Sequence, residues 1–562
     1  MPDERPPHRI PATPVDDTGR RQALRVAVAL GGAALGATRA APVPAADPRA
    51  ATAGLPGTSS QGRPGTLARD HPDPFTLGVA SGYPHEQGMV LWTRLAPVPD
   101  APLGGMSEDP VEVTVEIAHD EKFTNIVQRR TAWTTAEWAH SVHAEVAGLE
   151  PGRWYWYRFL ARGHRSPTGR TRTTPPGDAT DTRLRFGAVC CQHYELGYFS
   201  AYRALVDDAP DLIVHLGDYL YEGHGGADAV RRLDGPPPVT LDDYRVHHAR
   251  YKRDPDLQRA HAACPWLLTW DDHEVENDYA ADRSGAQWPR QWFLARRAAA
   301  YRAYYEHMPL PRWMLPVGPE MRIHTEWWFG RLARFFMLDT RQYRDDEVCP
   351  DKRSGFLRGL DPGDCPPLHD PARTMLGWQQ RRWLFGRLPG NPEIPWTILG
   401  NQTLMQPASV RFDDDRPLVF TDGWDGYFGE RDALLAILGD TRVANTVVLS
   451  GDVHAFYANA LARDDARPHE RVVATEFVCG AVTAPAPSAR FVARVQAEHP
   501  AVRFTHADKR GYVRFDVDAR ELRASMIGMS SVREPGGRAL ELASFRVAAG
   551  RAGPERLSGP AR

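Results

Sequence analysis

Residues that can bind metals or move protons stand at the ends of short apolar segments in this chain. Each segment ends at Gly or at a polar residue, a pattern typical of a buried strand. The segments are 184–189, 211–216, 266–270, 334–338, 396–399 and 446–450. In open α/β sheets, ligands gather beyond the carboxyl ends of such strands. Cys, Asp, Tyr and His at these ends therefore predict a metal-dependent hydrolase.

The most specific motif is the Gly-Asp-x-x-Tyr run that begins at Gly217. Asp218 follows a strand and can bridge two metals with its two oxygens. Tyr221 lies three residues later and can reach the same metal, and its phenolate is a hard oxygen that favours Fe³⁺. In the alternative interpretation, Asp218 caps a helix and Tyr221 only packs.

Cys191 follows the strand at 184–189, where a thiolate would add negative charge to a trivalent metal site. The alternative is a buried, inert thiol. That alternative suits Cys190 better, because it lies one step earlier on the strand and points to the opposite face.

The run 271–274 is Asp-Asp-His-Glu and offers two chemical roles. Asp272 is a candidate oxygen ligand for a second metal. His273 is a candidate for stabilising or protonating a departing oxygen. The alternative is a group of carboxylates that cap a helix N-terminus.

Asp452 and His454 stand two residues apart after another strand, so both can face the same side of an extended segment. A single His is more often structural, but this position after a strand and a Gly favours metal ligation. Arg341 ends a further strand and could bind a phosphate oxygen bidentately. A structural ion pair of Arg341 with Asp339 or Glu274 is the alternative.

The bulk composition and the N-terminus narrow the class of protein. The chain has 562 residues and a formal charge of −3, which predicts several domains and argues against sequence-specific nucleic-acid binding. Arg20 and Arg21 precede a small-residue apolar stretch, which predicts a twin-arginine export signal over 1–46 and the export machinery as a partner. A membrane anchor is the alternative, but the stretch is too short to span a bilayer. We expect a secreted or cell-envelope protein without a transmembrane span in its mature form.

The later sequence divides into two predicted domains. Residues 47–70 predict a flexible leader, and period-two alternation over 71–176 predicts a small β-sandwich. Its turn at 149–152, followed by Tyr155 and Tyr157, resembles the fibronectin-type corner. Strands alternate with helical stretches over 182–533, which predicts an α/β domain. Residues 534–562 predict a C-terminal tail.

Six cysteines occur, and two of them flank a Gly-, Asp- and Pro-rich loop. In an oxidising compartment Cys349 and Cys365 are expected to form a disulfide. Two free thiols are the alternative.

Taken together, the motifs resemble the alkaline phosphatase D (PhoD-like) family of metallophosphoesterases. The matching runs begin at Cys191, Gly217, Trp270, Leu338, Gly400 and Ser450. The resemblance implies a four-layer, calcineurin-like α/β fold of two sheets between helices, preceded by a fibronectin- or immunoglobulin-like β-sandwich. It also implies Fe³⁺ and Ca²⁺ as cofactors.

The resemblance implies a role for each candidate ligand. Asp218 would bridge the two metals, and Tyr221, Cys191 and His454 would hold iron. The other two carboxylates, Asp272 and Asp452, would hold the second metal.

The activity implied is hydrolysis of phosphate mono- and diesters by a metal-activated hydroxide, with small phosphate esters, teichoic-acid-like polymers or phospholipids as substrates. A phospholipase D-type activity on phospholipid headgroups is the alternative in the same site. A non-catalytic binding module with structural metals is a second alternative. A purple-acid-type phosphatase with iron and zinc is a third, which should carry more His ligands.

Overall fold

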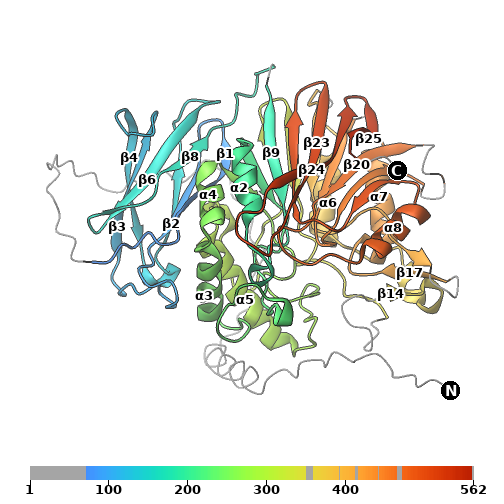
Figure 1. The fold of residues 1–562 in the computed structure, drawn as a ribbon, viewed down its shortest axis with the longest axis horizontal. Coiled ribbons are helices and arrows are strands. Elements are labelled where there is room, and N and C mark those ends of the chain that lie inside the picture. The colour runs from blue at the N-terminus through green and yellow to red at the C-terminus, as the bar shows by residue number, and fades with distance from the viewer. Residues whose placement is uncertain are drawn as a thin grey trace, which may run out of the picture.

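Two large β-sheets form the centre of the protein, and helices lie against their outer faces (Figure 1). The computed structural model describes residues 71–180, 182–349, 359–390, 393–411, 416–440, 442–464, 467 and 471–559. The mixture of helices with sheets whose central strands are parallel is an α/β fold, as the sequence predicts.

The first sheet has ten strands in the order β25-β24-β23-β22-β9-β10-β11-β1-β2-β5. Three central parallel strands carry the first three predicted segments, and they are β9 (Leu184–Val189), β10 (Leu212–His215) and β11 (Trp266–Leu268). The antiparallel strands beyond β9 are β22 (Gly511–Val517), β23 (Glu521–Met529), β24 (Ala539–Ala548) and β25 (Arg551–Ser558). The strands beyond β11 are β1 (Val79–His85), β2 (Gly88–Arg94) and β5 (Ser141–Val146).

The second sheet has seven strands in the order β12-β13-β15-β18-β20-β19-β21. Its central parallel strands are β13 (Ala333–Met337), β15 (Trp396–Gly400), β18 (Thr446–Ser450) and β20 (Val472–Val478). The outer strands are β12 (Thr325–Phe329), β19 (Phe456–Ala462) and β21 (Val502–His506). A small third sheet consists of β14 (Gly359–Leu360), β17 (Pro417–Phe420) and β16 (Val410–Arg411).

The two large sheets pack through their apolar faces and form the main core. The rings of Phe186 in β9 and Phe335 in β13 lie 5.5 Å apart, and those of Phe477 in β20 and Phe515 in β22 lie 5.7 Å apart. Parallel strands that are buried on both faces are continuous apolar runs. This burial explains why apolar and polar residues do not alternate along the six predicted segments.

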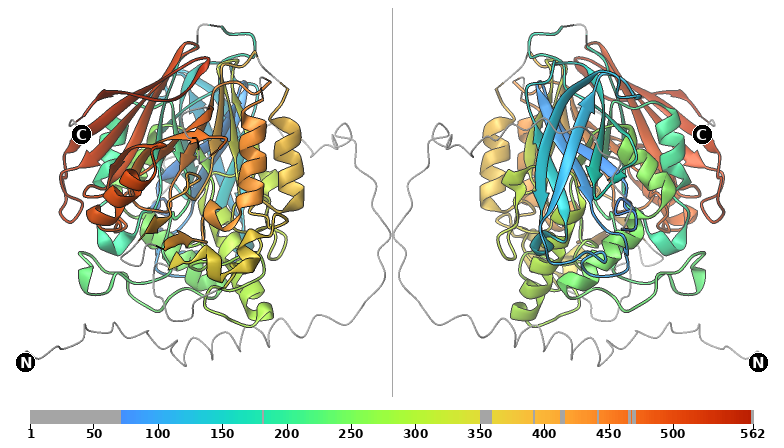
Figure 2. Two further views of the ribbon diagram at one scale, coloured as in Figure 1. Left: turned by 90° about the vertical axis from the view of Figure 1, so that its right-hand side faces the viewer. Right: turned by 90° about the vertical axis from the view of Figure 1, so that its left-hand side faces the viewer.

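Helices cover the outer faces of both sheets. On the first sheet, α2 (Ser200–Asp207) packs against β9 so closely that a Cβ on Gly187 would lie 2.4 Å from a methyl carbon of Leu205. On the second sheet, α6 (Gly377–Arg387) and α7 (Phe428–Leu438) lie side by side on one flank (Figure 2) and join a buried cluster with β13, β15 and β18. The remaining α-helices of the described residues are α3 (Leu241–Lys252), α4 (Pro255–Ala263), α5 (Arg290–His307) and α8 (Ala489–Glu498).

The N-terminal region packs two sheets together but shares one of them with the rest of the protein. β1, β2 and β5 continue the ten-stranded sheet through the parallel pair of Gly82 and Trp266. The facing sheet consists of β3 (Val111–Ala118), β4 (Ile126–Thr134), β6 (Trp154–Ala161), β7 (His164–Arg165) and β8 (Gly169–Arg172). Tyr155 contacts the turn at 149–152, because the Glu150 N–H donates to Tyr155 Oη at 2.8 Å.

The residues after Arg533 extend the first sheet, which corrects the predicted tail at 534–562. β24 pairs with β23, and β25 pairs with β24, both antiparallel. Alternate side chains of β24, namely Ala543, Phe545 and Val547, are buried. This period-two pattern is the usual signal of a strand. The Gly- and Arg-rich composition around it led to the wrong prediction.

Two further predictions concern the covalent structure and the N-terminus. Cys349 and Cys365 form the predicted disulfide, so they are not free thiols. The predicted export signal at 1–46 and leader at 47–70 lie outside the described residues. Within the described ranges, every helix is too short or too polar to cross a bilayer.

Candidate functional site

The ends of parallel strands bring the predicted ligands to one edge of the two sheets. β9, β10 and β11 end level with one another, because their last residues pair across the sheet. Cys191, Asp218 and Asp272 follow these three ends, while Asp452 and His454 follow β18. These four strand ends therefore place residues that are far apart in sequence next to each other.

One group of side chains surrounds Asp218. The donor atoms of Cys191, Asp218 and His454 all lie within 4.8 Å of one another. Tyr221 Oη donates to Asp218 Oδ2 at 2.7 Å and lies 3.0 Å from His454 Nε2. Four predicted iron ligands thus meet at one point.

Asp218 also belongs to a second group on its other side. Donor atoms of Asp218, Asp272 and His273 lie within 4.8 Å of one another, and so do those of Asp271, Asp272 and Asp452. Because a carboxylate has two oxygens, Asp218 can contact cations on both sides at once. The geometry brings together all six predicted metal ligands, and Asp271 lies beside them.

Four of these residues hold an uncommon backbone conformation. The φ angles are 57° at Cys191, 56° at Asp218, 63° at Asp452 and 57° at His454. A positive φ is uncommon outside glycine and costs about 1–3 kcal/mol at each position. Gly217 has a φ of 121°, and a Cβ there would lie 2.6 Å from the backbone nitrogen of the loop after β11. Strained loops that aim polar side chains are typical of functional sites.

The central acids have buried oxygens that accept no hydrogen bond from the described residues. Asp218 is 1% exposed and Asp272 is 3% exposed, and Oδ1 of each has no hydrogen-bond partner among the described residues. Burial raises the pKa of Asp218 well above its ordinary value, and the charges of Asp272 and Asp271 add to that increase. A buried, unpaired carboxylate is costly. Hard, oxygen-binding cations therefore fit this donor set.

The thiol of Cys191 and the imidazole of His454, in the first group, also suit a bound cation. Burial raises the pKa of the Cys191 thiol well above its ordinary value, so a thiolate there requires an adjacent cation. His454 Nδ1 lies 2.7 Å from the Pro485 carbonyl oxygen, which places the proton on Nδ1 and leaves the Nε2 lone pair facing Tyr221. Burial lowers the pKa of His454 to about 4, so the imidazole is neutral. This is the usual state of a metal-binding histidine.

His273 is held by a carboxylate that the sequence analysis missed. Its Nδ1 lies 2.7 Å from Glu222 Oε2, and Glu222 Oε1 accepts the Asn277 N–H at 2.8 Å. The ring of His273 lies 4.1 Å from that of Tyr221. Burial opposes protonation of His273, but the charges of Glu222, Asp272 and Asp218 raise its pKa well above its ordinary value. The contact with Glu222 thus favours the protonated imidazole of His273 beside the cluster.

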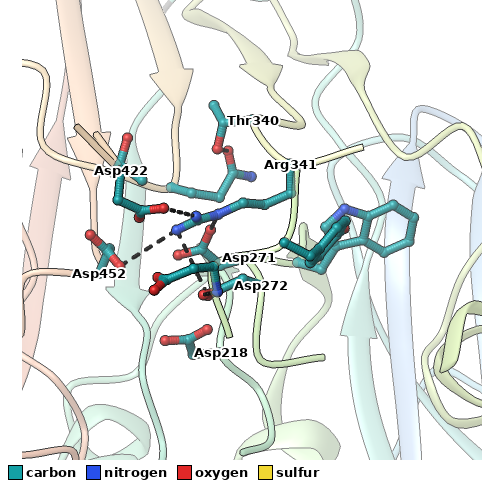
Figure 3. Close-up of polar contacts among 12 residues, drawn as sticks. Asp218, Asp271, Asp272, Thr340, Arg341, Asp422 and Asp452 are labelled. Atoms are coloured by element: carbon teal, nitrogen blue, oxygen red, sulfur yellow. Dashed lines mark hydrogen bonds and ion pairs between the residues drawn. The ribbon is translucent and has the colours of Figure 1, made fainter. Parts of the chain in front are cut away.

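Arg341 lies among the acids but is enclosed by them (Figure 3). Its side chain is 0% exposed, Nε pairs with Asp271, and Nη1 donates to Asp422 Oδ1 at 2.6 Å. Nη2 lies 3.7 Å from Asp272 and 3.6 Å from Asp452. This geometry favours the ion-pair alternative over direct phosphate binding. The ion-pair partners, however, are neither Asp339 nor Glu274.

Two other acids have structural roles that were not predicted. Glu274 accepts backbone N–H groups from Asp218, Tyr219 and Asp271, so it holds the loops after β10 and β11 together. Asp422 follows β17 and also accepts from Arg344 at 2.8 Å. In the sequence, the one sign of the role of Glu274 is its position beside the predicted ligands.

The cluster opens into a cavity of about 380 Å³. One part of its lining is polar, with Asp218, Asp272, His273, Asp452 and His454. The remainder includes apolar residues such as Phe420 and Phe491. Neither Cys191 nor Arg341 lines this cavity among the described residues.

Comparisons with known proteins agree with this geometry. Residues 186–526 match the PhoD-like phosphatase family, and residues 60–175 match its N-terminal domain. The chain is 41% identical to alkaline phosphatase D of Bacillus subtilis (strain 168) over 485 residues, which cover 84% of this chain and 80% of that protein. The solved structure of PhoD is similar with a TM-score of 0.81 and 39% identity, covering 87% of this chain and 93% of that one. The chain therefore belongs to the PhoD-like phosphatase family and is a phosphoric ester hydrolase.

Proposed function

We propose that this phosphoesterase hydrolyses phosphate mono- and diesters at the strand-end cluster with Fe³⁺ and Ca²⁺ as its cations. The observation that carries the proposal is the position of Asp218. Its carboxylate lies between a group with phenol, thiol and imidazole donors and a group of carboxylates. The first group suits a trivalent iron, and the second suits a hard divalent ion.

The donors divide between the two cations as follows. Tyr221, Cys191 and His454 would hold the iron, Asp272 and Asp452 would hold the calcium, and Asp218 would bridge the two. When bound, the cations would lower the pKa of a water molecule and neutralise charge that develops on the phosphoryl group.

Protein groups then supply the remaining steps. His273 lines the cavity and would give a proton to the departing oxygen. Glu222 would orient the imidazole and keep it protonated, because its carboxylate accepts from Nδ1. Arg341 would fix the positions of Asp271 and Asp422 without contacting the substrate.

Metal analysis together with a substrate panel tests the proposal. Purified protein should contain iron and calcium, should lose turnover in excess EGTA, and should regain it when calcium is restored. Zinc in place of calcium would favour the purple-acid alternative. The panel compares a monoester, a diester and phosphatidylcholine, and rapid phosphatidylcholine hydrolysis would favour the phospholipase D-type alternative.

A colour test addresses the iron ligand separately. A phenolate or thiolate bound to iron(III) absorbs visible light, so Tyr221→Phe should shift or remove the band. Tyr457→Phe is the matched control, because Tyr457 lines the same cavity outside the donor cluster. An unchanged band in Tyr221→Phe would remove Tyr221 from the ligand set.

The finer fold and the location are also proposals. The stacked sheets with helices on their outer faces support a calcineurin-like layering, and the contact of Tyr155 with its turn supports a fibronectin-like N-terminal unit. Arg20 and Arg21 support export by the twin-arginine route. Replacing both with Lys should leave the protein inside the producing cell, which cell fractionation measures.

A further inference from the structure

The cavity beside the metal cluster has an apolar wall that catalysis at phosphorus does not require. Its members include Leu404, Phe420, Val453, Ala486, Pro487 and Phe491. Water and phosphate gain nothing from such a surface. Binding pockets that combine a few polar groups with apolar and aromatic walls are instead typical of sites for organic ligands.

The wall is fixed in position by the core behind it. Phe420, at the end of β17, and Phe491, in α8, are both partly exposed and form an edge-to-face pair with ring centroids 5.5 Å apart and planes at 80°. Both pack against a buried cluster that includes Val492 and Val495 of α8. Two rings that are supported in this way form a rigid apolar surface rather than a loose flap.

The wall is also continuous with the metal cluster. Val453 stands between Asp452 and His454 in the chain and lines the cavity. The Pro485 carbonyl holds His454 Nδ1, and the next residue, Ala486, lines the cavity. A phosphoryl group at the cluster would therefore have its organic substituent within reach of the wall.

We propose that this wall is a subsite for an apolar group carried by the ester, and that Phe420 and Phe491 make the enzyme prefer esters with such a group. The inference deepens the proposed function, because it requires a phosphoryl group at the cluster. The cavity volume of about 380 Å³ leaves room for a substituent beside the phosphoryl group. Each methylene that leaves water for the wall should tighten binding roughly fourfold.

Alkylphosphonates test the subsite without any influence of leaving-group chemistry. Methyl-, butyl- and hexylphosphonate are measured as competitive inhibitors of the holoenzyme with ethyl phosphate as substrate. The inhibition constant should fall with chain length, by up to roughly fourfold per methylene. In Phe420→Ala/Phe491→Ala the dependence on chain length should become much weaker, while inhibition by inorganic phosphate stays the same.

Phe420→Leu/Phe491→Leu is the matched control, because it keeps an apolar wall of smaller volume. It should retain most of the chain-length dependence, and thermal melting reports whether each variant is folded. If methylphosphonate and phosphate inhibit but longer chains bind no more tightly, the subsite is wrong and the proposed function stands. If none of these compounds inhibits, the proposed function itself fails.

A second comparison identifies the source of the apolar group. One substrate is p-nitrophenyl phenyl phosphate, and the other is the short-chain lipid dihexanoylphosphatidylcholine, both kept monomeric. The subsite predicts that wild type turns over at least one of them with a lower KM than methyl p-nitrophenyl phosphate. It also predicts that Phe420→Ala/Phe491→Ala raises that KM with little change in kcat. An equal KM for all three substrates would overturn it.

Discussion

The acidic cluster has two halves that differ in what completes their charge. On one side, Asp271 and Asp422 surround Arg341, and their pairs with its guanidinium are made within the protein. On the other side, Oδ1 of Asp218 and of Asp272 accepts no hydrogen bond among the described residues, and the guanidinium of Arg341 comes no closer than 3.7 Å to Asp272. Asp218, Asp271 and Asp272 are all buried, so the difference among these acids lies in the partner rather than in the solvent.

This difference separates acids that shape the site from acids that can bind cations. A buried carboxylate with an internal guanidinium is already neutralised, and it has little to offer a metal ion. A buried carboxylate with an unpaired oxygen gains most from a cation. Residues of the same type a few ångströms apart can therefore have different roles, which their sequence neighbours do not reveal.

The largest effect is expected at Asp218, whose Oδ1 accepts no hydrogen bond from the described residues. Asp218→Asn removes the charge that both donor groups share, so turnover should fall by more than about 10³-fold. Metal content, measured by elemental analysis, should fall as well. The melting temperature should stay the same or rise when metal is absent, because the substitution relieves repulsion with Asp272 and Asp271.

A paired acid in the same cavity is the matched control for Asp218→Asn. Asp425 lines the cavity, but its Oδ1 accepts from Arg431 at 3.1 Å. Asp425→Asn should therefore keep its metals and lose some stability. If the two variants lost metal equally, the distinction between open and paired acids would be wrong.

The next largest effect is expected at Arg341 and concerns the stability of the protein. Arg341→Met leaves the buried Asp271 without its cation, while Asp422 keeps Arg344, so the free energy of unfolding should fall by about 3–5 kcal/mol. Thermal melting of the metal-free protein measures this loss. The double variant Asp271→Asn/Arg341→Met removes the unpaired charge of Asp271 and should recover part of the lost stability. A melting temperature unchanged by Arg341→Met would contradict the claim that Arg341 neutralises the buried Asp271.

A smaller effect is expected at His273, the proposed proton donor. Glu222→Gln removes the charge that raises the pKa of His273, so the protonated donor is lost at lower pH. The alkaline limb of the pH–rate profile should move to lower pH, and kcat should fall by about 10–100-fold. Glu222→Asp keeps the charge and should move the limb less. An unchanged profile in Glu222→Gln would leave Glu222 with only a structural role.

The sequence predicts the strand ends well because parallel strands leave a local signal. The predicted segments 184–189 and 446–450 coincide with β9 and β18. The ligands follow from these strands, since the carboxyl ends of parallel strands meet at one edge. Cys191, Asp218 and His454 could therefore be placed together without any tertiary information.

The partners of the charged groups could not be predicted in the same way. Arg341 meets Asp422, which lies 81 residues later and reaches it only because the chain passes through the small sheet with β17. The role of Glu222 is apparent only from its contact with His273 in the folded protein. Pairings of this kind depend on how loops pack, and a local pattern does not contain that information.

The smallest effect is expected for Cys190→Ala. Its comparison with Cys191→Ala tests which of the two thiols after β9 faces the metals. Cys190 Sγ lies 3.7 Å from the Cys479 carbonyl oxygen, whereas Cys191 Sγ belongs to the group of Asp218 and His454. Cys190→Ala should cost about 1 kcal/mol of stability and leave the visible band and iron content unchanged. Cys191→Ala should lose both at a similar cost in stability. A band that disappears in Cys190→Ala but survives in Cys191→Ala would move the ligand to the other thiol and reverse the facing assigned to the end of β9.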